Sequence, residues 1–175
     1  MAAANLASES AVRWNPLRGP RTELEQEMPT WHGDPLLPEA LVLDEPFALE
    51  DSAAFGAGLV MGQSRASMIP ARALDPQPGE RILDMCAAPG AKATQLAALA
   101  DGKAEIVAIE MHSSRASGLR EMAERMGAPM TVIDGDAREV EIPGGLFDAV
   151  LVDAPCTGTG VLASRPDARW RRREE

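Results

Sequence analysis

The chain has 175 residues, of which 45% are hydrophobic, and a formal net charge of −10. This length suffices for one domain with a buried core. The sequence contains no apolar run of about 18 residues, so no membrane span is predicted. The acidic balance argues against a nucleic-acid binder with an overall basic face.

The N-terminus and the two cysteines indicate the cytoplasm as the compartment of the protein. No basic segment followed by a long apolar core marks a secretion signal at the N-terminus, so we expect a cytoplasmic protein. Cys86 and Cys156 are then expected to be reduced thiols, with a disulfide between them as the alternative.

The N-terminal residues are rich in proline and are predicted to form an irregular lead-in over 1–50, with a short helix at 22–27 and a strand at 41–43. Arginines cluster around Trp14 there and around Trp170 near the C-terminus: Arg13, Arg18, Arg21, Arg165, Arg169, Arg171, Arg172 and Arg173. Such clusters either bind RNA phosphates or form solvated surface segments.

The remaining residues, 51–175, are predicted to form a second domain. A turn and a strand are expected within 56–63, and a helix within 64–74 whose N-cap is Ser64. Strands and helices then alternate, which predicts parallel βαβ units. The expected strands are 81–85, 104–110, 130–133 and 147–153, and the expected helices are 91–100 and 113–127. The predicted fold class is therefore α/β, with a ligand site at the carboxyl ends of the strands.

A loop of small residues follows the first of these strands: Cys86-Ala87-Ala88-Pro89-Gly90-Ala91-Lys92. Small side chains let a ligand approach the backbone, and the start of the next helix offers N–H groups. The loop lacks both the Gly-Lys-Ser/Thr of a phosphate loop and the G-x-G-x-x-G dinucleotide fingerprint. An ordinary strand–helix turn is the alternative.

Acids follow the other strands. Glu110 could accept hydrogen bonds from both hydroxyls of a ribose, and an acid of the segment Asp134-Gly-Asp136 could accept one from an adenine amino group. A helix-start acid and an Asp-Gly turn are the respective alternatives. The last strand leads into Asp153-Ala-Pro-Cys156-Thr-Gly-Thr-Gly160, where a proline aims a thiol that could otherwise be a small buried hydrophobe.

Together these segments resemble the RNA (cytosine-5) methyltransferases of the Sun/NOL1/NOP2 group, which include bacterial ribosomal-RNA enzymes. Segment 86–92 is similar to their cofactor loop, with Ala91 where glycine is usual, and segment 153–160 is similar to their Asp-Ala-Pro-Cys-Ser-Gly motif. Weaker likeness extends from Val12 to Trp170. The resemblance implies a Rossmann-like class I S-adenosylmethionine-dependent methyltransferase sheet with a small N-terminal α+β extension.

The resemblance further implies S-adenosyl-L-methionine as the cofactor and RNA, in particular ribosomal RNA, as the partner, without a metal or a membrane; the complete protein is expected to be a monomer. The implied cofactor-binding residues are Cys86, Ala87, Ala88, Pro89, Gly90, Ala91, Lys92, Glu110, Asp136 and Asp153. The implied catalytic residues are Cys156, Asp153 and Lys92.

In the chemistry of this group, a thiolate attacks C6 of cytosine and makes C5 nucleophilic toward the methyl group. Cys156 matches the second thiol, which helps to release the product, while Asp153 holds the base and Lys92 favours negative charge nearby. The attacking cysteine lies in a Thr-Cys pair on the next strand, and this sequence has no such pair.

We therefore expect a truncated gene product or a partial sequence, whose sheet lacks its last strands and whose strand 148–153 is an uncovered apolar edge. Two alternatives remain open. Cys156 itself could attack, as the Pro-Cys thiol does in DNA methyltransferases. The chain could instead be a catalytically inactive cofactor- or RNA-binding fragment.

Overall fold

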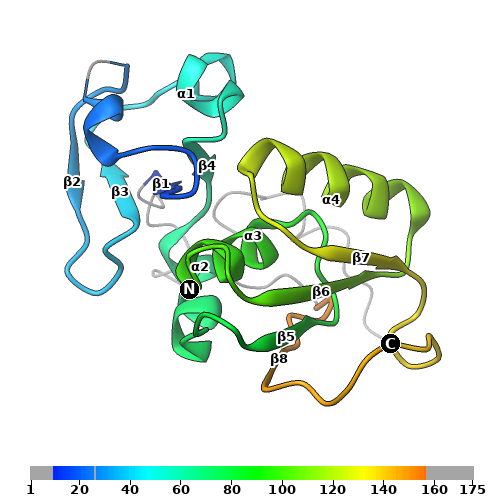
Figure 1. The fold of residues 1–175 in the computed structure, drawn as a ribbon. Helices are drawn as coiled ribbons and strands as arrows, with labels where there is room; N and C mark the ends of the chain where they lie inside the picture. The colour runs from blue at the N-terminus through cyan, green and yellow to red at the C-terminus, as the bar shows by residue number, and fades with distance from the viewer. Residues whose placement is uncertain (1–9, 26, 157–175) are drawn as a thin grey trace, which may run out of the picture.

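The computed structural model describes residues 10–25 and 27–156, which form two four-stranded sheets (Figure 1). The N-terminal sheet is antiparallel, in the order β2-β3-β1-β4. Its strands are β1 (Ala11–Trp14), β2 (Trp31–Gly33), β3 (Ala40–Leu43) and β4 (Val60–Gly62). The second sheet is parallel, in the order β7-β6-β5-β8. Its strands are β5 (Arg81–Asp84), β6 (Glu105–Glu110), β7 (Thr131–Asp134) and β8 (Ala149–Leu151).

Helices connect the strands and join the two sheets. They are η2 (Arg21–Leu24), η3 (Leu49–Asp51), α1 (Ala53–Gly56), α2 (Arg65–Leu74), α3 (Ala91–Leu99) and α4 (Ser113–Met126). Helix α2 leads from the N-terminal sheet to β5 and packs against α3. Helix α3 connects β5 to β6, and α4 connects β6 to β7 (Figure 1). No helix in the described part of the chain has the length and apolar composition of a membrane span.

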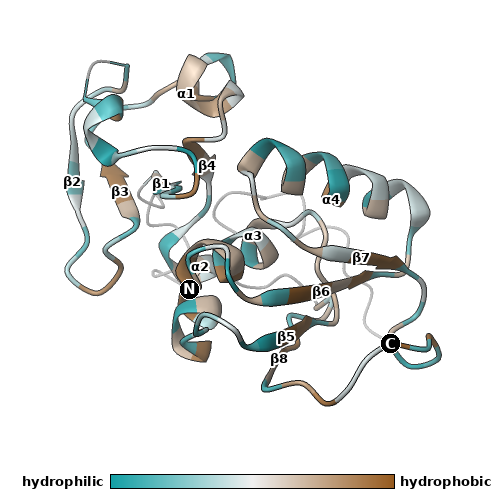
Figure 2. Cartoon of the chain, in the orientation of Figure 1, coloured by the Kyte–Doolittle hydropathy of each residue, from teal (hydrophilic) through white to brown (hydrophobic). Residues whose placement is uncertain are grey.

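The central strands β5 and β6 of the parallel sheet are buried on both faces, as their apolar sequences predict, whereas β7 and β8 are partly exposed. Alternate residues of β6 enter different clusters: Ile106 packs with the core that contains α3, and Ile109 packs with Leu83 on β5 and with the segment after β7. Figure 2 shows hydrophobic residues along β6 and β3. The candidate ligand site lies at the carboxyl ends of these packed strands.

The α/β class and the order of elements after residue 80 are confirmed, with strand bounds shifted by a few residues at most. Ser64 caps α2, because its Oγ accepts a hydrogen bond from the Ser67 N–H, as predicted. The prediction of an irregular lead-in is wrong for β1 and β2, and the expected helix at 22–27 is a 3-10 turn over Arg21–Leu24. Strands of three or four residues are too short to show a clear hydrophobic alternation in the sequence. Their position is set by pairing with strands that are distant in the chain.

Two further expectations concern the domain boundary at residue 50 and the uncovered edge of the parallel sheet. The domain boundary at residue 50 stays a prediction, although β4, which follows it, pairs with β1. Within the described residues, β8 pairs with β5 alone, and Val150 and Val152 beside that edge are exposed. Segments 157–160 and 165–173, which hold the rest of the second motif and the C-terminal arginine cluster, lie outside the described residues.

The N-terminal arginines serve the fold. Arg13 is 1% exposed, Arg18 donates to the carbonyls of Glu124 and Arg125 at the end of α4, and the Arg21 guanidinium lies 4.5 Å above the Trp31 ring. Neither of the two predicted alternatives, a phosphate-binding patch or a solvated segment, describes Arg13. Arg13 and Arg18 instead attach the N-terminal sheet to the second half of the chain, while Arg21 packs within the N-terminal half.

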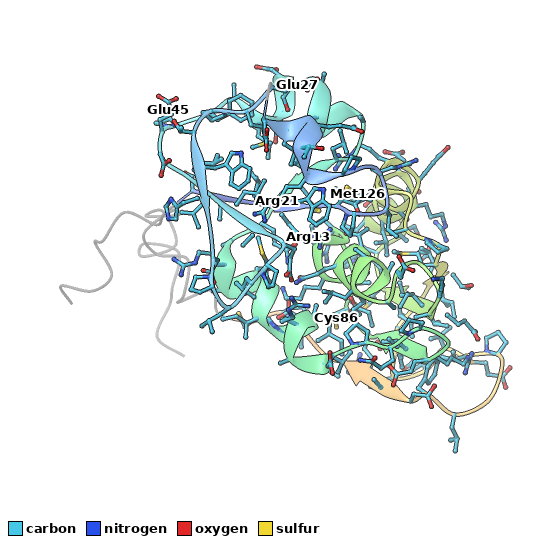
Figure 3. All side chains as sticks on the ribbon, turned by 60° about the vertical axis from the view of Figure 1, so that its left-hand side comes forward. Arg13, Arg21, Glu27, Glu45, Cys86 and Met126 are labelled. Carbon is cyan, nitrogen blue, oxygen red and sulfur yellow. The ribbon has the colours of Figure 1, made fainter. Side chains whose placement is uncertain are left out.

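We call this attachment the junction; it consists of Arg13, Asn15, Gly58, Met126 and the start of α3. The Asn15 Nδ2 amide donates to the carbonyl oxygens of Gly58 and Met126, at 2.9 and 2.8 Å. Arg13 reaches from β1 to the first turn of α3, where it donates to the Ala91 carbonyl at 2.5 Å. Figure 3 shows Arg13 and Met126 between the N-terminal strands and the helices of the parallel-sheet half. The junction therefore holds both the start of α3 and the end of α4.

Candidate functional site

Most of the predicted site residues gather at the carboxyl edge of the parallel sheet. In its register Asp84 pairs with Ala108 and Leu151, and Glu110 pairs with Asp134, so the ends of the four strands lie side by side. The charges of Asp84, Glu110 and Asp153 all act on the Cys86 thiol, which places three carboxyl groups around the loop after β5. No group of His, Cys, Asp or Glu side chains in the described chain is arranged to hold a metal ion.

The loop 86–92 is held by its neighbours on the sheet and on α4. The Ala87 N–H donates to the Ile109 carbonyl at 2.9 Å, and Arg115 donates to the Ala88 carbonyl at 2.7 Å. Gly90 ends the loop with φ +111, a conformation that favours glycine, and a Cβ there would lie 2.8 Å from Leu119 Cδ1. The glycine therefore lets the loop turn into α3 while it packs against α4.

Glu110 is a buried acid at the end of β6, only 4% exposed. Its carboxylate accepts the His112 N–H at 3.0 Å and lies 3.3 Å from a guanidinium nitrogen of Arg115. This arginine, which also holds the loop at Ala88, was missed in the sequence, where nothing marks its approach to Glu110. The Glu110 carboxyl group is thus held in a buried place by two donors, and its oxygens have lone pairs for further donors.

Asp136 follows the end of β7 and is bound by its own neighbour. The Arg138 side chain and N–H both donate to its carboxylate, at 2.9 and 3.0 Å. The hydrogen bond from the Arg138 side chain, helped by that from its N–H, lowers the pKa of Asp136 to about 2. Asp136 is therefore ionised and able to accept hydrogen bonds throughout the neutral pH range. It lies in the Asp-Gly turn that the sequence offered as the alternative to a role in adenine binding.

Lys92 and Asp153, two of the predicted catalytic residues, are in direct contact. Lys92 Nζ lies 2.6 Å from Asp153 Oδ2 and donates to Ser67 Oγ at 3.1 Å. The Lys92 side chain is 16% exposed and that of Asp153 is 53% exposed. A cation from the start of α3 is thus fixed between the segment after β8 and Ser67 of helix α2.

The two cysteines differ in their surroundings and are not joined by a disulfide. Burial raises the pKa of the half-buried Cys86 thiol, and the charges of Asp84, Glu110 and Asp153 raise it further. Cys86 is therefore protonated at neutral pH and a weak nucleophile, which suits a lining residue. Cys156 is exposed, three residues after Asp153.

Asp84, the last residue of β5, is a site residue to which sequence reasoning gave no role. It is 1% exposed and accepts the Cys86 N–H at 3.2 Å. Burial raises its pKa to about 6, and the charge of Asp153 adds to this rise while the Cys86 N–H and Lys92 oppose it. Its position at the end of an apolar strand was the available signal.

The raised pKa makes stability depend on pH. Between the ordinary value of 3.8 and about 6, the folded chain binds the Asp84 proton more tightly than the unfolded chain, so stability falls as pH rises through this window. Above it the ionised carboxylate costs about 3 kcal/mol. We expect Asp84→Asn to be more stable than the wild type by about this amount at pH 8 and equal to it near pH 4.

Urea unfolding at both pH values checks this expectation. The control is Asp51→Asn, an exposed carboxylate for which we expect the same small difference at either pH. An effect of Asp84→Asn that stays constant from pH 4 to pH 8 would contradict the role assigned to its titration.

Comparison with known proteins gives one consistent result. The model of the family "16S rRNA methyltransferase RsmB/F" matches residues 71–175. The ribosomal RNA small subunit methyltransferase B of Proteus mirabilis is 38% identical over 154 residues, which cover 87% of this chain and 36% of the relative. Its counterpart in Bacillus subtilis, called probable, is 29% identical over 95% of this chain and 39% of its own.

Solved structures agree with this result. A methyltransferase homolog from Pyrococcus horikoshii is 29% identical, with a TM-score of 0.78, over 97% of this chain and 58% of that chain. The chain spans about a third of the length of the curated relatives that it matches.

Proposed function

Because the chain belongs to the RsmB/F family of 16S rRNA methyltransferases, we propose that it forms part of the catalytic domain of an enzyme that methylates C5 of cytosine in ribosomal RNA with S-adenosyl-L-methionine. The observation that carries this proposal is the gathering of the loop 86–92, Glu110 and Asp153 at one edge of the parallel sheet. In open α/β sheets, ligands bind at that edge.

The groups at this edge fit the cofactor. A buried carboxylate such as Glu110 suits two neighbouring ribose hydroxyls, and the ionised Asp136 suits an amino group of adenine. Asp153 is half-exposed and able to accept from the methionine ammonium. When bound, S-adenosylmethionine supplies an electrophilic methyl group.

The contact between Lys92 and Asp153 fits the target base. The Asp153 carboxylate would accept a hydrogen bond from cytosine and assist protonation at N3, while the Lys92 ammonium stabilises negative charge beside it. In the whole protein a thiolate adds to C6, C5 takes the methyl group, and loss of the C5 proton expels the thiolate. We assign the product-releasing role to Cys156, which is exposed at the end of the same segment.

Cofactor binding by this chain is the first test. We expect S-adenosylmethionine to bind the 175-residue chain in calorimetry, and Glu110→Gln and Asp136→Asn to weaken binding about tenfold each, since each loses a charged acceptor. Glu121→Gln, which removes an exposed carboxylate from α4, is the control and should bind as the wild type does. Absence of binding, or equal affinities for all four proteins, would refute the proposed pocket.

The reaction itself separates the proposal from the alternatives. Transfer of a labelled methyl group to cytosine C5 of ribosomal RNA would support the enzyme, whereas cofactor binding without transfer would support the inactive fragment. If Cys156→Ser abolishes transfer without leaving a protein–RNA adduct, Cys156 is the attacking thiol. If an adduct accumulates instead, in a longer chain that has the other cysteine, the releasing role holds.

A further inference from the structure

We propose that Ser67 is a positioning residue that keeps the Lys92 ammonium in the site while Asp153 binds ligand. This inference rests on the proposed function, because it concerns the same site. The juxtaposition that carries it is the hydrogen bond of 3.1 Å from Lys92 Nζ to Ser67 Oγ, across 25 residues of sequence.

Ser67 is itself held firmly. It lies in the first turn of α2, where its N–H donates to Ser64 Oγ at 3.2 Å and its carbonyl accepts from Gln63 Nε2 at 3.2 Å. The same Gln63 amide donates to the buried Gln95 of α3 at 2.8 Å, and Gln95 donates to the Met68 carbonyl at 3.0 Å. The hydroxyl of Ser67 is thus placed relative to α3, the helix that carries Lys92.

The other partner of Lys92 is less fixed. Asp153 lies past the end of β8, with 53% of its side chain exposed, and the proposed function requires its carboxylate to bind the base or the cofactor. A lysine side chain has a flexible stem of four carbons and loses much rotamer entropy when it is held in one place. Without a second acceptor, the ammonium would be released whenever Asp153 turned to a ligand.

Ser67 meets this need in a specific way. A neutral hydroxyl accepts from the ammonium without neutralising its charge, so Lys92 keeps its electrostatic effect on the base. The ammonium has three N–H donors; Ser67 and Asp153 take two of them, and one remains for a ligand. Because Ser67 is half-buried and its side chain has no other hydrogen bond within the described residues, its replacement should leave the fold intact.

The composition of the chain makes this testable by nuclear magnetic resonance. Lys92 and Lys103 are its two lysines, so a chain with ¹⁵N-labelled lysine has two side-chain ammonium signals. Hydrogen bonding slows the exchange of ammonium protons with water. We expect Ser67→Ala to speed this exchange at Lys92 at least about fivefold, the factor that corresponds to one lost hydrogen bond. Ser67→Thr keeps the hydroxyl and should restore the slow rate.

Lys103, whose side chain is 65% exposed and paired with Asp101, is the internal control and should not change in any variant. In Asp153→Asn, Lys92 should keep part of its protection, and Asp153→Asn combined with Ser67→Ala should remove it. Equal exchange at Lys92 in wild type and Ser67→Ala, or equally fast exchange in Ser67→Thr and Ser67→Ala, would overturn the inference.

Calorimetry with S-adenosylmethionine distinguishes this failure from that of the proposed function. If the wild type binds the cofactor but Ser67→Ala leaves Lys92 exchange unchanged, the positioning role alone is refuted. If the wild type binds no cofactor although Ser67→Ala frees Lys92, the proposed function fails and the positioning role loses the reaction that it serves, so the inference is overturned with it.

Discussion

Replacing Arg13 with methionine should lower the free energy of unfolding by about 3 kcal/mol and detach the N-terminal sheet from α3. The Arg13 guanidinium donates to Gln63 Oε1 at 2.9 Å, to the Ala91 carbonyl at 2.5 Å and to Thr94 Oγ1 at 2.8 Å. Methionine fills similar space but leaves the buried acceptors Gln63 Oε1 and Thr94 Oγ1 without this donor, and the Ala91 carbonyl keeps only its weaker contact with Thr94 Oγ1 at 3.3 Å.

The cost of keeping an arginine there sets the limit of this effect. Burial lowers the pKa of Arg13 to about 9, against the charge of Glu39, which raises it. Glu39 also contacts Arg72 at 3.3 Å and so keeps a cationic partner in the variant. Arg13→Lys should fall between wild type and Arg13→Met, because it retains the charge but not the planar fork that reaches two acceptors at once.

Denaturant unfolding measures this loss, and Arg120→Met provides the matched control. Arg120 is exposed and makes one hydrogen bond, to the Val132 carbonyl at 3.2 Å, so its replacement should cost less than about 0.5 kcal/mol. Thr94 Oγ1, which accepts from Arg13, donates in turn to the Gly90 carbonyl at 2.7 Å. Arg13→Met should therefore also weaken cofactor binding at the loop. Similar stabilities of Arg13→Met and Arg120→Met would contradict this account of the junction.

Replacing Gly58 with alanine should destabilise the chain by more than about 3 kcal/mol, well beyond the backbone strain of a positive φ alone. Gly58 has φ +74, and a Cβ there would lie 2.1 Å from the carbonyl oxygen of Arg125, at the end of α4. Backbone cannot move aside as a flexible side chain can. The Gly58 carbonyl also accepts one of the two hydrogen bonds from Asn15.

Gly79→Ala is the matched control, because it separates strain from collision. Gly79 has φ +88, but no atom lies within 4 Å of its would-be Cβ. We expect it to cost about 1 kcal/mol, the usual penalty for a left-handed residue that is not glycine. Midpoints of denaturant unfolding for the two variants check the difference. If both cost the same, the close approach between Gly58 and α4 does not contribute to stability.

The local pattern of the sequence sufficed for the parallel-sheet half. Its strands are apolar along their length, α2 begins at a serine cap, and α4 ends at Gly127 with φ +61. Each of these signals depends on neighbours within a turn or a strand. They place Glu110 and Asp153 after strands, and parallel strands end at a common edge, so their gathering could be foreseen.

Tertiary contacts decided the remainder. Arg13 was read as a surface residue but is buried by α3, 78 positions away. Arg115, Ser67 and Asp84 gain their roles from partners on other elements, and of the three only Asp84, at the end of an apolar strand, has a local signal. Sequence alone thus determined which residues could do chemistry, because residue type and local periodicity carry that information. The fold decided which of them meet, because burial and hydrogen bonds between distant segments exist only after the chain has packed.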